Sequence, residues 1–252
     1  MSQPKERSDS KRTFHVKPEI RKKNNAPGKS KSKTISLFYW ILPFLVPIFA
    51  LIAIVIHKNN IRLYISMARE DHVVEWVTFI FLFVSGLLSL ILAAYLKKKS
   101  DRYALFFLLF GVGCILFSAE EISWGQRIFG YESSEFFLER SDQREINIHN
   151  VLQKEFHFKT KHVTGWVLFL YGSCLPILYL IERIKKITTH LRLKVPPLSL
   201  SPSFFIGSAF MIDKPTGIEE EYGELLLSLC LLIFIGLEYY KEKRLKGGSL
   251  ND

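Results

Sequence analysis

Apolar residues along the chain gather into six long runs that are separated by shorter polar segments. The runs cover residues 35–56, 73–96, 103–118, 163–181, 198–212 and 223–240. A helix needs about 20 predominantly apolar residues to cross a hydrocarbon core of about 30 Å. The pattern therefore predicts an all-α membrane protein, a bundle of six transmembrane helices with a long structured loop, 120–162, between the third and fourth.

The fifth run is the exception, because it is short and contains Pro202, Gly207 and several serines. A re-entrant or soluble core segment is the alternative interpretation of such a run. Without it, however, the acidic stretch "DKPTGIEEEYG" would lie on the same side of the membrane as the basic amino terminus. We therefore expect six spans.

The basic residues indicate the orientation of these spans. With six spans, 24 of the 34 Lys and Arg residues lie on the side of the amino terminus. Cytoplasmic loops carry such an excess, so the pattern predicts a multi-pass membrane protein with both termini in the cytoplasm. The segment 1–34 is expected to be a disordered basic tail beside anionic lipid headgroups, with no nucleic-acid partner, and 241–252 a short cytoplasmic tail.

Composition and motifs narrow the possible functions only slightly. Hydrophobic residues make up 48% of the chain and include 21 Phe, which is typical of a membrane protein. The three cysteines lie in separate apolar runs, and their spacing indicates neither a disulfide framework nor a zinc site. The chain contains no P-loop, G-x-G-x-x-G, G-x-S-x-G or H-E-x-x-H motif, so the sequence signals none of these familiar chemistries and no cofactor.

Acidic residues gather at the predicted outer ends of the spans. They open the second and sixth spans and close the third: Asp71, Glu75, Glu120, Glu121, Glu219, Glu220, Glu221 and Glu224. If the third helix continues through "EEISWGQR", then Glu120, Trp124 and Arg127 share one face and Glu121 turns to another. This geometry predicts a structural ion pair between Glu120 and Arg127 and leaves Glu121 for function. The alternative is a water-facing helix end with Trp124 as an interfacial aromatic residue.

A second polar cluster, "SDQREINIHN", lies at 141–150 in the long loop. As a strand or as a helix, it brings Glu145 and His149 to one face, with the helix favoured by the apolar residues that follow. This pair is a candidate general base with its orienting acid, or two metal ligands. Two ligands do not make a metal site, and we predict none.

The two clusters together resemble a pattern of an uncharacterised family of bacterial multi-pass membrane proteins. The resemblance covers "EEISWGQR" followed by Q-x-E-x-N-x-H-N, about 118–150. It implies a location in the cytoplasmic (inner) membrane of a bacterium but no activity. It marks nine positions for study: Glu120, Glu121, Trp124, Gln126, Arg127, Glu145, Asn147, His149 and Asn150.

Two functions follow as hypotheses. The first is a membrane-embedded enzyme acting on a lipid or lipid-linked headgroup. Its catalytic candidates are Glu121, His149 and Glu145, and its substrate-binding candidates are Arg127, Gln126, Trp124, Asn147 and Asn150. The second is a non-catalytic membrane assembly or interaction protein whose polar cluster holds the loop on the bundle. A proton-coupled transporter is disfavoured, because no ionisable group lies in the middle of a span.

Overall fold

The computed structural model describes residues 38–69, 72–99, 101–140, 146–156, 160–212 and 218–248, and these ranges are helical without any strand. The predicted amino-terminal tail, 1–34, lies outside them. The elements in order are η1 (Leu42–Phe44), α2 (Leu45–Asn59), α3 (Ile61–Met67), α4 (Val73–Lys98), α5 (Ala104–Glu121), η2 (Ser123–Gly125), α6 (Gln126–Phe129), α7 (Glu135–Arg140), α8 (Ile148–Phe156), α9 (Thr160–Phe169), η3 (Leu170–Cys174), α10 (Leu175–Leu178), α11 (Glu182–His190), η4 (Leu198–Leu200), α12 (Ser201–Phe210) and α13 (Glu219–Gly248).

Within the described ranges, four helices are long and apolar enough to cross a membrane. They are Phe38–Asn59, Val73–Lys98, Ala104–Glu121 and Glu219–Arg244. They correspond to the first, second, third and sixth apolar runs. The prediction of an all-α protein is therefore confirmed for this part of the chain, with four helices that are candidates for membrane spans.

The fourth and fifth runs form less regular structure. The fourth consists of α9, the π-helical turn η3 and α10, with Pro176 in the first turn of α10. The fifth is the short helix α12, preceded by η4. The two segments pack closely, because a Cβ atom on Gly172 would lie 2.1 Å from the ring of the buried Phe204. Only glycine permits this approach of the backbone to an aromatic ring.

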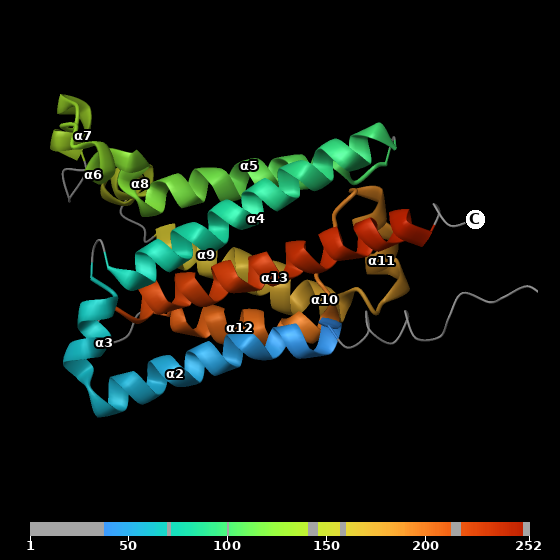
Figure 1. The fold of residues 1–252 in the computed structure, drawn as a ribbon, viewed down its shortest axis with the longest axis horizontal. Helices are drawn as coiled ribbons and strands as arrows, with labels where there is room; N and C mark the ends of the chain where they lie inside the picture. Colours follow the sequence, from blue (N-terminus) through green and yellow to red (C-terminus); the bar gives the residue numbers. More distant parts are fainter. Residues whose placement is uncertain are drawn as a thin grey trace, which may run out of the picture.

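Figure 1 shows that the four long helices, the α9–α10 segment and α12 lie side by side and run alternately in opposite directions, with α13 in the interior. The burial of α13 agrees with this position. In its most apolar 18-residue stretch, 78% of the residues are buried, against 22% in the corresponding stretch of Phe38–Asn59. The α13 side chains Leu226, Phe234 and Ile235 are almost fully inaccessible. This helix therefore forms the core, and the other long helices expose apolar side chains on the outside of the bundle.

Small residues allow α4 and α5 to pack against each other at close range. A Cβ atom on Gly86 would lie 3.0 Å from the Gly111 carbonyl oxygen, and the buried Ser89 hydroxyl donates to the Phe107 carbonyl at 2.7 Å. Such contacts are typical of transmembrane helix pairs, where small residues let backbones approach and hydroxyls bond across helices. The pair forms one wall of the cavity described below.

The two ends of the bundle differ in charge. We call the end where α5 finishes and α13 begins the acidic end, and it also carries α3, α6, α7 and α8 (Figure 1). The opposite, basic end carries the amphipathic helix α11. There Lys194 Nζ lies 2.7 Å from Glu238, whose side chain is 7% exposed, and the Tyr171 hydroxyl donates to the Lys194 carbonyl at 2.8 Å. The sequence pattern does not reveal this buried ion pair between Lys194 and Glu238.

Candidate functional site

A cavity of about 490 Å³ lies between α4, α5, the α9–η3 segment and α13. Ligand pockets in proteins commonly enclose about 300 to 1,000 Å³. Most of the lining is aliphatic or aromatic. It comprises Thr78, Leu82, Phe106, Phe110, Gly113, Cys114, Phe117, Glu121, Val163, Thr164, Val167, Leu168, Tyr171, Leu193, Met211, Glu224, Leu227, Ser228 and Leu231.

The cavity is long, and its charged groups lie at one end. Its lining on α5 extends from Phe106 to Glu121, which at 1.5 Å per residue is about 22 Å along the helix axis. Glu121 and Glu224 line it at the acidic end. Toward the basic end it is lined by Leu193, Phe106 and Tyr171, whose hydroxyl is already bonded to the Lys194 carbonyl. The cavity is therefore charged at one end and apolar along its length.

The cavity also opens sideways between α5 and α9. Three of its lining side chains, Phe117, Val163 and Val167, are exposed by 55%, 49% and 57%. These residues lie at the level of the apolar runs that predict spans, so the opening faces the side of the bundle that a bilayer would cover. An apolar molecule could pass through it without entering water.

Lys161, at the start of α9, joins the carboxylates of the acidic end. Its Nζ lies 2.7 Å from Glu221 Oε1 and 3.1 Å from Glu224 Oε2, and all three side chains are only 18–20% exposed. Burial lowers the pKa of the Lys161 ammonium, but the carboxylates of Glu224 and Glu221 outweigh burial and raise that pKa well above its ordinary value. Lys161 is therefore a permanent cation that links α9 to α13.

Glu121 is placed differently from Glu224, although both line the cavity. Its carboxyl group interacts electrostatically with Glu224, Lys161, Glu221 and Glu75. Its carboxylate forms no hydrogen bond with any residue in the described ranges. Of the two carboxylates, Glu224 is therefore held by Lys161, and Glu121 is available to a bound molecule.

The third predicted helix does not continue through "EEISWGQR", so this expectation is wrong. Helix α5 ends at Glu121, and Ser123, Trp124 and Gly125 have φ values of 46°, 55° and 80°. Consecutive left-handed residues cannot continue a right-handed helix. The turn is held by the Tyr131 hydroxyl, which donates to the Trp124 carbonyl at 2.6 Å.

Glu120 and Trp124 nevertheless come together across this turn. The indole Nε1 of Trp124 donates to Glu120 Oε1 at 2.6 Å. The predicted ion pair of Glu120 with Arg127 lies outside the described part of the structure, because that part does not include the Arg127 side chain. Trp124 is 37% exposed and serves as a hydrogen-bond donor to Glu120.

The two predicted clusters of the loop contact each other through amide side chains. Gln126 accepts from the backbone N–H of Ile146 at 2.9 Å and donates to the Ser133 hydroxyl at 2.8 Å. The buried Asn147 donates to the Glu120 carbonyl at 3.5 Å. These two substrate-binding candidates thus hold the loop against the end of α5.

The remaining candidate site residues lie at the edge of the described ranges or outside them. Helix α8 begins at Ile148, so the described residues before it, 146 and 147, are not helical. Glu145 and the side chains of His149 and Asn150 lie outside the described part of the structure. The predicted pairing of Glu145 with His149 therefore stays a prediction.

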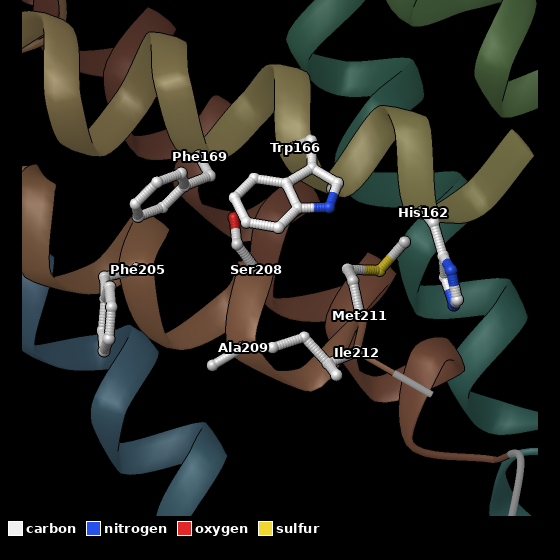
Figure 2. Close-up of a pocket in the computed structure, with 9 residues that line it drawn as sticks. His162, Trp166, Phe169, Phe205, Ser208, Ala209, Met211 and Ile212 are labelled. Atoms are coloured by element: carbon white, nitrogen blue, oxygen red, sulfur yellow. The ribbon is translucent and has the colours of Figure 1, made fainter. Parts of the chain in front are cut away.

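A second, smaller hollow of about 290 Å³ lies between α9 and α12. Figure 2 shows Trp166 and Phe169 reaching from α9 over the Ser208 hydroxyl, with His162 and Met211 at the other end. The Ser208 Oγ and His162 Nε2 atoms are buried and have no hydrogen-bond partner among the described residues. This hollow contains no carboxylate, so the larger cavity is the better candidate site.

Comparison with known proteins adds no further information, since no family model, curated protein or solved structure matches the chain. Among the described residues, no group of three or more His, Cys, Asp or Glu side chains is arranged to hold a metal ion.

The sequence pattern indicates Glu121 as a candidate site residue but does not single out Lys161. A signal for Lys161 was available, because it lies just before an apolar run, on the same predicted side as "EEEYGE" at 219–224. A cation that enters a span normally has an acidic partner. Which of the many acids would be its partner depended on the packing of α9 against α13.

Proposed function

We propose that the chain is a six-span protein of the bacterial cytoplasmic membrane, with both termini in the cytoplasm, and that its cavity binds a lipid or a lipid-linked molecule. The alternating directions of the helices and the excess of basic residues on one side support the topology. Of the six proposed spans, the fourth (α9 to α10) and the fifth (α12) depart most from a long regular helix.

The observation that carries the proposal is the cavity with charged groups at only one end and an opening at its side. A lipid has the matching distribution, an apolar tail and one polar headgroup. In this arrangement the tail lies along Phe110, Cys114 and Leu231, and the headgroup meets Glu121 and Glu224. A water-soluble ligand would gain little from so apolar a lining.

In the enzymatic form of this proposal, Glu121 is the general base. A carboxylate that lines the cavity without a hydrogen bond is placed to accept a proton from the headgroup or from water. Glu224, held by Lys161, places a second carboxyl group nearby. Incubation of the protein with a bacterial lipid extract should change the headgroup composition seen by mass spectrometry, and Glu121→Gln should abolish that change.

Binding is tested by filling the cavity. A Cβ atom at Gly113 has no neighbour within 4 Å, and this residue lines the cavity, so Gly113→Leu should occupy its space without a clash. We expect native mass spectrometry to find co-purified lipid on the wild-type protein and little or none on Gly113→Leu. The matched control is Gly236→Leu on α13, which is equally free of neighbours but does not line the cavity. Equal lipid on all three proteins would refute the proposal.

The contacts of Gln126 and Asn147 support a second candidate, a non-catalytic assembly protein whose ordered loop is the binding surface. Both side chains are used to hold the loop on α5. In that case Gln126→Leu should disrupt association with a partner protein, detected by cross-linking in membranes, whereas Gly113→Leu should leave the association intact.

A further inference from the structure

The charges at the acidic end of the cavity bear on the kind of headgroup that it accepts. Glu121, Glu221 and Glu224 interact with one another and share a single ammonium group, that of Lys161. Lys161 forms its ion pairs with Glu221 and Glu224, and among the described residues no other cation is hydrogen-bonded to Glu121. The three carboxyl groups can hold three negative charges, whereas Lys161 supplies one positive charge, so a further cation would favour their ionised forms.

A negative charge this close to an apolar cavity is unfavourable unless a cation approaches it. Acidic groups at membrane depth usually face the bundle interior and pair with a cation or a backbone group. Glu121 faces the cavity and, among the described residues, has no such hydrogen-bonded partner. A cationic group at the end of a bound tail would supply the missing charge.

We infer that the cavity selects amphiphiles with a cationic, amine-bearing headgroup, whose ammonium pairs with Glu121. The inference rests on the proposed lipid binding and specifies the class of ligand. An ammonium group can donate to Glu121 and Glu224 together, because it has several N–H donors in a compact group. A phosphate would disfavour the ionised forms of Glu121 and Glu224 through repulsion of like charges, and a neutral alcohol would supply no charge to pair with them.

The test uses the purified full-length protein in a neutral detergent and three amphiphiles with the same sixteen-carbon chain: hexadecylamine, hexadecanol and hexadecyl phosphate. Binding is measured by displacement of a fluorescent hexadecyl probe. We expect the amine to bind at least about tenfold more tightly than the other two. Glu121→Gln should remove most of this preference, whereas Glu132→Gln, an exposed residue outside the cavity lining, should leave it unchanged.

The outcomes separate this inference from the proposed function. Equal or tighter binding of the phosphate, lost in Gly113→Leu, would overturn the inference while lipid binding in the cavity stands. Binding of all three that is unaffected by Gly113→Leu would contradict lipid binding itself. The comparison of headgroups on the wild-type protein needs no variant to fold, so it decides the question even if Glu121→Gln is unstable.

Discussion

At the scale of single residues, Gly172 shows how closely two irregular segments can pack. A methyl group at this position would overlap the ring of Phe204, which is completely buried. We expect Gly172→Ala to lower the free energy of unfolding by about 1 to 3 kcal/mol, the usual cost of overpacking a core. Thermal unfolding in detergent measures the change. Gly236→Ala is the control because its Cβ has open space, and equal melting temperatures for the two variants would contradict the packing of η3 on α12.

Lys161 is the other residue whose loss should be costly. Lys161→Met would leave Glu221 and Glu224 without their cation, and breaking a buried ion pair in this way costs about 3 to 5 kcal/mol. The exposed Lys154 is the control, since Lys154→Met removes a lysine at the same end of the molecule. A loss no larger than that of Lys154→Met would show that the carboxylates do not depend on Lys161.

The contribution of Lys161 also has an expected pH dependence. Its pKa is higher in the folded protein than in the unfolded chain, so its stabilisation is fully present below the unfolded value of about 10.4 and is lost only as pH rises through the folded value. The difference in melting temperature between the wild-type protein and Lys161→Met should therefore not shrink between pH 7 and pH 9. A difference that shrinks over this interval would mean that the ammonium is not held by the two carboxylates.

At the scale of elements, helix bounds that depend on composition could be predicted from the sequence. Helix ends that depend on a few local contacts could not. The second apolar run, predicted at 73–96, corresponds to Val73–Lys98, because a long apolar stretch with terminal charges defines both its ends. The end of the third helix was not predictable in detail. Ser123 and Trp124 adopt left-handed conformations that these residue types rarely prefer. The turn is held by the Tyr131 hydroxyl, which donates to the Trp124 carbonyl, a side-chain contact that no apolar periodicity indicates.

The same limit applies to the candidate site. Glu121 could be singled out because an acid follows an apolar run, whereas its place in a cavity together with Glu224 and Lys161 depends on the packing of α5, α9 and α13. The roles predicted for Gln126 and Asn147 illustrate the difference. Polar residues in a pattern indicated binding, but their amides are bonded within the loop.

The loop segment before α8 should become more mobile when its contact with Gln126 is removed. Gln126→Leu deletes the acceptor for the Ile146 N–H, so the amides of 146–156 should exchange with solvent faster in hydrogen–deuterium exchange mass spectrometry. Glu132→Gln, an exposed change in the same loop, should not alter this exchange. Unchanged exchange in Gln126→Leu would show that the two clusters are independent.

At the scale of the whole molecule, the proposed topology places α11 and the loop around Glu132 on opposite sides of the membrane. In a background with the three native cysteines replaced by alanine, a cysteine at Glu132 should react with an impermeant thiol reagent on intact cells. A cysteine at Lys185, whose side chain is 52% exposed, should react only after the cells are permeabilised. Reaction of both cysteines from outside would rule out the six-span arrangement.

If the proposed ligand enters through the side opening between Phe117 and Val163, its concentration in the membrane sets the occupancy of the cavity. A ligand that enters from the bilayer has already left water. The transfer of its chain into the membrane, worth about 0.8 kcal/mol per methylene group, therefore precedes binding and does not contribute to it. Occupancy then follows the mole fraction of the ligand among its neighbouring lipids and does not depend directly on its vanishing concentration in water. Even a modest intrinsic affinity would keep the cavity filled when the ligand is an abundant lipid, and the fraction filled would track the composition of the leaflet that adjoins the opening.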